Sequence, residues 1–175
     1  MNNVFCTLLI ITVLSSCSNS QSIFSGGAGS QNAESSKLGA VLWQQTSAEY
    51  KALCHQAFNI ARAQLESGQV MRNSSGNSDR KPAIVLDLDE TVLNNSPYNG
   101  WLITNNKSYS EETWREWVLK AKATFIPGAQ QFIDFAQSNG YEVFYISNRS
   151  VELLEPTLSN LEKTGIDINK NHVFL

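Results

Sequence analysis

Hydrophobic and polar positions change between helical and strand-like spacing along most of the chain. From Leu38 to about Ser67, apolar residues recur at intervals of three and four, which predicts one long helix or two shorter ones, and Gly68 is the expected stop. Two runs of branched and aromatic residues, 83–87 and 142–146, predict buried strands. Residues 172–175 begin a third strand.

Helix signals separate these strands. Ser110 is followed by two acidic residues and predicts a capped helix that runs to about Ala123. The Pro127–Gly128 break precedes a helix over residues 129–139, which ends at Gly140. Another helix is expected over 151–163, with Gly165 as its stop. Two polar segments are expected to be loops: 73–80 and 94–100.

The order of these elements is strand, helical insertion, helix, strand, helix, strand. This order predicts an α/β fold with a doubly wound parallel sheet and right-handed crossovers. Ligands of such sheets bind beyond the carboxyl ends of the strands. Asp87, Asp89 and the residues that follow Ile146 are expected to lie at that edge.

The N-terminal segment reads as a targeting sequence. Residues 4–14 are largely apolar and too short to span a membrane as a helix, but they have the length of a signal core. The following Leu14-Ser15-Ser16-Cys17 resembles a bacterial lipoprotein cleavage site, although residues 1–3 carry no Lys or Arg. We therefore expect a lipoprotein signal peptide over 1–16 and lipidation of Cys17. The alternative is an ordinary secretory signal with a coincidental cysteine.

The remaining organisation follows from composition. Residues 17–37 are rich in Ser, Gly, Asn and Gln and predict a flexible tether, and residues 38–175 form the globular domain. Ser18, in place of an aspartate after the acylated cysteine, favours a bacterial outer-membrane lipoprotein, on the cell surface or on the periplasmic face. Cys54 would be the one cysteine left in the processed domain, and its apolar helical position indicates a core residue.

Charge narrows the class of partner. The 175 residues carry a net charge of −3 and no basic stripe, which argues against a nucleic-acid polymer. Small phosphorylated substrates remain possible, because one local cluster of donors suffices to bind them. The oligomeric state is not indicated.

The segment from Ile84 to Leu93 carries the strongest chemical signal. An apolar strand delivers Asp87 and Asp89 to its end, and burial of unpaired carboxylates costs several kcal/mol. Two carboxylates at this place suggest a metal site, a proton-transfer task, or both. The alternative is a pair of solvated aspartates in a turn.

A second polar group follows the next strand. Ser147, Asn148 and Arg149 offer a hydroxyl, an amide and a guanidinium, and a helix N-terminus near Val151 would add backbone donors. Alone, this triplet is typical of a helix cap; with the two aspartates it indicates phosphate binding. A carboxylate nucleophile, a second carboxylate and an oxygen-ligated Mg²⁺ together describe phosphoryl transfer through an aspartyl-phosphate.

The motif D-x-D-x-T-V-L, followed by a strand that ends in S-N-R, resembles the haloacid dehalogenase (HAD) superfamily. Within it, the chain is similar to the class C acid phosphatases, bacterial surface lipoproteins that act on aromatic monophosphates and nucleoside 5′-monophosphates at acidic pH. The segments 42–50 and 94–98 are also typical of that group. The resemblance covers residues 38–175. It implies a HAD-like, Rossmann-like sheet with a helical N-terminal segment and a helical insertion after the first motif.

The resemblance also implies roles for the motif residues. Asp87 corresponds to the nucleophile and Asp89 to the general acid/base, and the Asp87 side chain with the Asp89 carbonyl would bind Mg²⁺. Ser147 corresponds to the phosphate-binding hydroxyl, with Asn148 and Arg149 beside it. A nucleobase would need an aromatic platform. Four aromatic residues of the insertion are candidates, and packing in the core explains any one of them equally well: Tyr98, Trp101, Trp114 and Trp117.

Two motifs of that group are not found in the chain. A lysine is expected soon after the third strand, and a later Gly-Asp-Asn motif completes the metal site, whereas this sequence ends at Leu175. We therefore expect the N-terminal part of a surface-anchored, Mg²⁺-dependent acid phosphatase, with the C-terminal part of the fold missing. The alternative is a truncated, non-catalytic lipoprotein remnant. His55 and His172 lie outside any histidine-phosphatase context and are interpreted as incidental.

Overall fold

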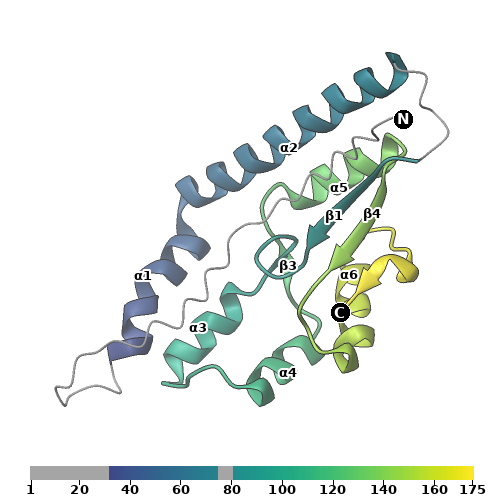
Figure 1. The fold of residues 1–175 in the computed structure, drawn as a ribbon. Coiled ribbons are helices and arrows are strands. Elements are labelled where there is room, and N and C mark those ends of the chain that lie inside the picture. Colours follow the sequence, from purple (N-terminus) through teal and green to yellow (C-terminus); the bar gives the residue numbers. More distant parts are fainter. Residues whose placement is uncertain (1–31, 75–80) are drawn as a thin grey trace, which may run out of the picture.

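The computed structural model describes residues 32–74 and 81–175, and a three-stranded parallel sheet lies at its centre (Figure 1). β1 (Ala83–Asp87) pairs with β4 (Glu142–Ile146), which pairs with β5 (Val173–Phe174). Asp87 lies opposite Ile146, and Ile146 lies opposite Phe174. The three predicted strands are therefore confirmed, and their carboxyl ends meet at one edge.

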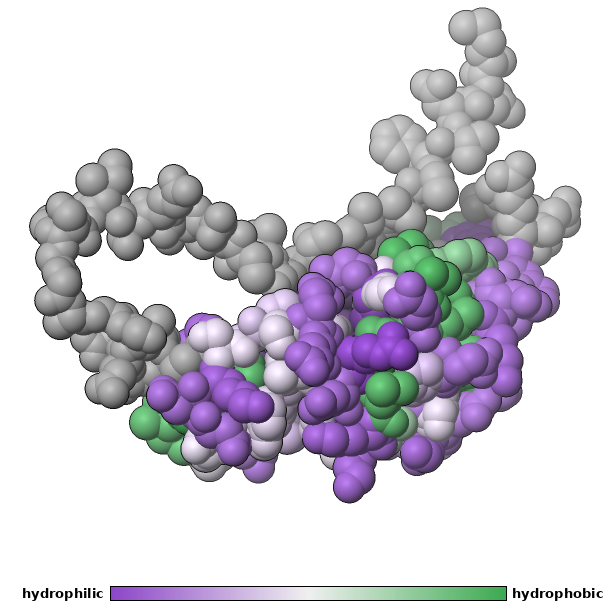
Figure 2. Space-filling view, turned by 90° about the horizontal axis from the view of Figure 1, so that it is seen from below, coloured by the Kyte–Doolittle hydropathy of each residue, from purple (hydrophilic) through white to green (hydrophobic). Residues whose placement is uncertain are grey.

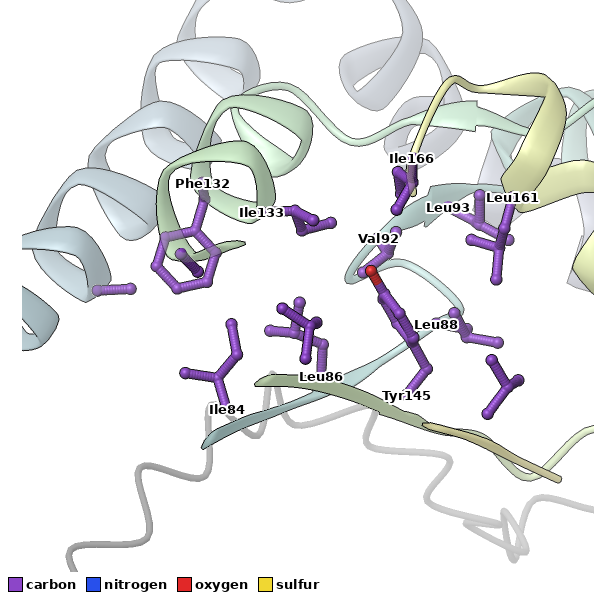
Figure 3. Close-up of a cluster of buried hydrophobic side chains, with 14 of the residues drawn as sticks. Ile84, Leu86, Leu88, Val92, Leu93, Phe132, Ile133, Tyr145, Leu161 and Ile166 are labelled. Atoms are coloured by element: carbon purple, nitrogen blue, oxygen red, sulfur yellow. The ribbon is translucent and has the colours of Figure 1, made fainter. Parts of the chain in front are cut away.

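One face of the sheet forms the floor of the hydrophobic core. Alternate residues of a strand point to the same face, and Ile84, Leu86, Val143 and Tyr145 are all buried on one side. Figure 3 shows Ile84 and Leu86 directed toward Phe132 and Ile133 of α5 (Ala129–Ser138), and Tyr145 directed toward Val92. A further helix, α6 (Leu154–Lys163), contributes Leu158 and Leu161 to the same cluster. The α/β class is thus confirmed.

The opposite face of the sheet is more open. Among the described residues, Ile146 and Phe174 keep 52% and 51% of their surface exposed, although both lie in paired strands. Figure 2, which is seen from the side at which the strands end, shows small groups of apolar residues between hydrophilic ones. The helices that pack on the core cluster in the described part of the chain thus cover one face of the sheet.

The N-terminal helical region consists of two helices. α1 (Asn32–Thr46) and α2 (Ala48–Ser74) are separated at Ser47. α1 packs against the insertion and α2 packs against α5, where Ala61 and Leu65 enter the core.

Three boundaries in this region were predicted wrongly. α1 begins at Asn32, so residues 32–37, which were predicted to belong to the flexible tether, are helical. α2 continues through Gly68 to Ser74, because a single glycine inside a helix costs only about 1 kcal/mol and does not by itself end it. The expected loop 73–80 starts no earlier than residue 75. The predictions for residues 1–31, including Cys17, and for residues 75–80 lie outside the described residues.

The insertion after β1 holds a small second sheet and two helices. β2 (Leu93–Asn94) pairs antiparallel with β3 (Thr124–Phe125), and α3 (Ser96–Thr104) and α4 (Glu111–Leu119) lie between them. The expectation of a loop over 94–100 was wrong, because Pro97 stands in the first turn of α3, where its missing N–H costs nothing.

The helix predicted from Ser110 is confirmed at its start. The Thr113 N–H donates to Ser110 Oγ at 3.2 Å, as expected of an N-cap. α4 ends at Leu119, before the predicted Ala123, and Ala121 adopts a left-handed φ of 47° just beyond it.

The later elements agree closely with the prediction. α5 begins after Gly128, whose φ is 89° and whose added Cβ would lie 3.1 Å from both His55 and Phe58. The helix predicted over 151–163 begins as a 3₁₀ turn, η1 (Val151–Leu153), and continues as α6. A second short turn, η2 (Lys170–His172), precedes β5. In the described part of the chain, no helix combines the length and the apolar character that crossing a bilayer requires.

Candidate active site

The two polar motifs predicted from the sequence meet at the carboxyl edge of the sheet. Asp87 is the last residue of β1, and Ser147 follows the last residue of β4, its neighbour. Ser147 Oγ donates to Asp89 Oδ2 at 3.4 Å, across 58 positions of sequence. Parallel pairing in register thus places the aspartates beside the Ser147–Arg149 segment.

The loop that carries the aspartates is anchored by its own backbone. The carbonyl of Leu88 accepts the N–H groups of Val92 at 2.9 Å and Leu93 at 2.7 Å, and Glu90 N–H donates to the Leu93 carbonyl at 2.9 Å. Leu88 itself is fully buried. The turn requires a left-handed backbone at Glu90, whose φ is 59°. The aspartates on either side of Leu88 are therefore held in a defined turn.

Asp87 is the accessible carboxylate of the pair. Its side chain is exposed at the strand end, and Thr91 Oγ1 donates to Oδ2 at 3.0 Å. Desolvation raises the pKa of Asp87, and the neighbouring charge of Asp89 adds to this increase. The Thr91 hydroxyl, the Leu88 N–H and the charge of Arg149 act in the opposite direction. An exposed carboxylate with one oxygen oriented by a hydroxyl can act as a nucleophile.

Asp89 is held by an arginine from the next strand. Arg149 donates from Nη2 to Asp89 Oδ1 at 2.6 Å and from Nε to Oδ2 at 2.9 Å, which makes a bidentate ion pair. The side chain of Arg149 is 2% exposed and that of Asp89 is 18% exposed. Arg149 Nη1 also donates to Thr157 Oγ1 at 3.0 Å, and its guanidinium lies 5.5 Å from the Trp114 ring.

The predicted phosphate-binding residues therefore differ in their surroundings. Ser147 is nearly buried, and its Oγ accepts the Arg149 N–H at 3.2 Å, which fixes the hydroxyl at the strand end. Asn148 is exposed to solvent. The Arg149 guanidinium binds the Asp89 carboxylate, and it belongs to the site through this contact.

Sequence reasoning did not single out Asn95. It is 1% exposed, and its Nδ2 donates to Asp89 Oδ1 at 2.8 Å. Its Oδ1 accepts from the Trp117 indole N–H at 2.8 Å, and its backbone N–H donates to Glu90 Oε1 at 3.1 Å. Its segment, residues 94–98, carried only the resemblance noted above and a turn composition, and neither assigns its side chain a role, because asparagine is common in ordinary turns.

The carboxyl group of Glu90 belongs to the same network. Desolvation raises its pKa, and the negative charges of Asp89 and Asp87 add to this, while the bonds from Asn95 oppose it. Three carboxyl groups thus lie close together in one loop, and Arg149 and Asn95 supply the donors that compensate them.

Aromatic residues of α3 and α4 gather beside this network. Tyr98 is at the centre: its ring centroid lies 5.3 Å from Trp114, 6.3 Å from Trp117 and 6.4 Å from Trp101. Its hydroxyl is 2.9 Å from Thr113 Oγ1, so Tyr98 is a packed residue of the insertion. A cavity of about 200 Å³ adjoins it, lined by Pro97, Tyr98, Trp101, Thr113, Glu116, Trp117 and Lys120. The structure therefore places three of the four candidate aromatic residues at one cavity and Trp114 against Arg149.

The oxygen donors of the loop fit a hard divalent cation in part. The exposed carboxylate of Asp87 and the backbone carbonyl of Asp89 are ligands of the kind that Mg²⁺ prefers, with water filling the remaining positions. The Asp89 side chain is engaged by Arg149 and Asn95. Within residues 32–74 and 81–175 there is no cluster of three or more His, Cys, Asp or Glu that could enclose a metal ion.

Comparison with known proteins gives consistent results. Residues 12–175 match the HAD superfamily, subfamily IIIB (acid phosphatase). The fold is similar to the class C acid phosphatase from Bacillus anthracis, with a TM-score of 0.75, 37% identity and coverage of 84% of this chain. The tungstate-bound form of a class C acid phosphatase from the same organism gives a TM-score of 0.72 at 39% identity, over 82% of this chain.

Plant proteins are more distantly similar. The chain is 28% identical to a stem 31 kDa glycoprotein of Glycine max over 81 residues, 46% of this chain, and 28% identical to a stem 28 kDa glycoprotein over 85 residues, 49% of this chain. The chain spans 59% and 58% of the two bacterial structures. The matched segments cover 32% and 34% of the two plant proteins.

Proposed function

This chain belongs to the acid phosphatases that form subfamily IIIB of the HAD superfamily, and we propose that it hydrolyses phosphomonoesters through a phosphorylated Asp87. The observation that carries this proposal is the exposed Asp87 carboxylate beside an Asp89 carboxylate held by Arg149, at a sheet edge that Ser147 shares. Nucleophile and proton carrier are then separate groups in one short loop.

The chemistry proceeds in two displacements. A carboxylate oxygen of Asp87 attacks phosphorus, the bond from phosphorus to the ester oxygen breaks, and that oxygen takes a proton from Asp89. Water then attacks the phosphoryl group and gives one proton to Asp89, the bond from phosphorus to Asp87 breaks, and orthophosphate leaves. Over the two displacements, Asp87 returns to a free carboxylate and Asp89 regains the proton that it gave to the leaving group.

The remaining groups of the site bind and orient. The Ser147 hydroxyl, at the end of β4, would donate to a phosphoryl oxygen. The Asp87 carboxylate and the Asp89 carbonyl would hold Mg²⁺, whose charge neutralises the anionic ester when bound. Arg149 is proposed to hold Asp89 in place, because its side chain is almost completely buried against that carboxylate. The exposed Asn148 is proposed to contact the phosphate.

A nucleoside 5′-monophosphate is the proposed substrate class. The aromatic cluster of α3 and α4 is joined to the aspartate loop through Trp117 and Asn95, and its rings can stack with a base. The similarity to a class C acid phosphatase with tungstate bound supports an oxyanion site, because tungstate is a tetrahedral oxyanion like phosphate.

Attachment to the membrane is a separate proposal, supported by the sequence alone. The segment over 1–16 would be removed, Cys17 would be lipidated, and the protein would lie at the bacterial outer membrane. Metabolic labelling with a fatty acid should mark the wild-type protein and leave the Cys17→Ser variant unlabelled. Equal labelling of both would contradict it.

The enzymatic proposal is tested by phosphate release from a nucleoside 5′-monophosphate at mildly acidic pH, with Mg²⁺ or with EDTA. Wild-type turnover that requires the metal and falls by at least about 10³-fold in Asp87→Asn is the expected result. Circular dichroism of both proteins is the control for folding. A folded wild-type chain without turnover would contradict the proposal and favour a non-catalytic role.

A further inference from the structure

We propose that Asn95 is a positioning residue, which fixes the orientation of the Asp89 carboxylate and ties it to helix α4. This inference rests on the proposed phosphatase function. Asn95 lies between β2 and α3 and is 1% exposed, so its amide has exchanged all water contacts for contacts with the protein. Buried amides of this kind are retained where each of their polar atoms has a defined partner.

The contact with Asp89 distinguishes the two oxygens of its carboxylate. Asp89 Oδ1 accepts from Asn95 Nδ2 at 2.8 Å and from Arg149 Nη2 at 2.6 Å. Asp89 Oδ2 accepts from Arg149 Nε at 2.9 Å and is the oxygen that faces Ser147 Oγ, at 3.4 Å. Arginine alone binds both oxygens in a symmetric fork, whereas the Asn95 donor commits Oδ1. Arg149 Nε also lies 3.2 Å from Oδ1, so Oδ1 has more donors than Oδ2, and Oδ2, on the side of Ser147, is the less engaged oxygen, which under the proposed function serves the leaving group.

The contact with Trp117 fixes the amide itself. An indole N–H can only donate, so the atom of Asn95 that lies 2.8 Å from Trp117 Nε1 is the amide oxygen. The amide nitrogen must then face the carboxylate, which only accepts. The Asn95 backbone N–H is held by Glu90 Oε1 at 3.1 Å, which fixes the residue at its other end. The position of α4 thereby determines where Asn95 places its donor.

This role differs from that of a residue that only stabilises the fold. Loss of fold stability lowers the amount of active enzyme and affects every substrate by the same factor. Loss of Asp89 orientation impairs protonation of the leaving oxygen, which a strongly basic alkoxide needs and a stabilised phenolate does not. kcat/KM reports the steps up to formation of the phosphoryl enzyme, so it isolates this effect.

The experiment compares two substrates, an alkyl monophosphate and p-nitrophenyl phosphate, with the full chain in the presence of Mg²⁺. Asn95→Ala should lower kcat/KM for the alkyl ester by about 100-fold and for the p-nitrophenyl ester by less than about 10-fold. Trp117→Phe keeps Asn95 and removes the indole N–H together with part of the ring, and it should show the same selectivity at about 10-fold. The matched control is Asn94→Ala, because Asn94 Oδ1 accepts from Ser96 N–H and contacts Gln44 rather than Asp89. It should change both substrates equally.

Equal losses for the two substrates in Asn95→Ala and Trp117→Phe, or no loss, would overturn the inference while the proposed function stands. If Asn95→Ala does not fold, Trp117→Phe decides on its own. A folded wild-type chain that hydrolyses neither ester would overturn the proposed function and this inference with it.

Discussion

Arg149 Nη2 lies 2.6 Å from Asp89 Oδ1, although 60 positions of sequence separate the two residues. Asp89 follows β1 and Arg149 follows β4, and these strands are neighbours in register, so the pair joins the two halves of the site directly. Because the guanidinium is buried, it cannot exchange this partner for water. The ion pair therefore makes the geometry of the aspartate loop dependent on the Ser147–Arg149 segment.

Removal of the arginine head group should destabilise the protein strongly. Arg149→Met leaves Asp89 without its positively charged partner and removes the arginine donor to the Thr157 hydroxyl, and breaking a buried ion pair costs about 3–5 kcal/mol. Because Asp89 is partly exposed, we expect the lower end of that range in urea unfolding. The matched control is Arg115→Met, whose guanidinium lies 3.9 Å from Glu152 on exposed side chains and whose loss should cost less than about 1 kcal/mol. Equal costs for the two variants would contradict the assignment.

The hydroxyl of Tyr145 should be dispensable for stability. It points into the apolar cluster (Figure 3) and has no hydrogen-bond partner in the described part of the protein. An unpaired buried hydroxyl costs about 1–3 kcal/mol, so Tyr145→Phe should leave the melting temperature unchanged or raise it. Tyr141→Phe is the matched control, because the Tyr141 hydroxyl donates to the Leu65 carbonyl at 2.8 Å and its loss should destabilise by about 1 kcal/mol. A larger loss in Tyr145→Phe than in Tyr141→Phe would contradict this.

The turn at Glu90 should favour glycine over alanine. Its φ of 59° costs an L-residue about 1–2 kcal/mol, and both substitutions remove the same carboxyl group. Glu90→Gly should therefore be more stable than Glu90→Ala by about 1 kcal/mol in urea unfolding. At Glu66, an exposed position inside α2, the order should reverse by about the same amount, because glycine weakens a helix. The same order at both positions would refute the role of backbone strain.

Ionisation of Asp87 should destabilise the metal-free protein. Its pKa is raised above the ordinary 3.8, chiefly by desolvation, so the native state binds this proton more tightly than the unfolded state does. The resulting stability is present below pH 3.8 and is lost as the pH rises through the higher pKa of the folded state. Asp87→Asn carries no such charge, so with EDTA its melting temperature should exceed that of the wild type at neutral pH. This advantage should shrink on acidification toward pH 4; a difference that stays constant with pH would speak against it.

Much of the local structure could be read from the sequence. Runs of branched and aromatic residues predicted β1 and β4, and the Ser110 cap predicted the start of α4, because these signals depend on neighbours a few residues away. The same reasoning failed at Ser96–Thr104, where turn-like composition hid a helix that begins with Pro97. It also ended α2 at Gly68, whereas the helix continues to Ser74, because one glycine weakens a helix by only about 1 kcal/mol.

The candidate site also has one part that could be predicted from the sequence and one part that could not. The sequence by itself determined which chemical groups stand at the ends of β1 and β4, since a strand of known direction delivers the residues that follow it to one edge of the sheet. Only the tertiary structure decided the partners of those groups: Arg149 turned to Asp89, and Asn95 placed between Asp89 and Trp117. Periodicity is a property of the backbone and is visible in a short window. The choice of hydrogen-bond partner depends on which distant elements pack together, and no spacing along the chain records it.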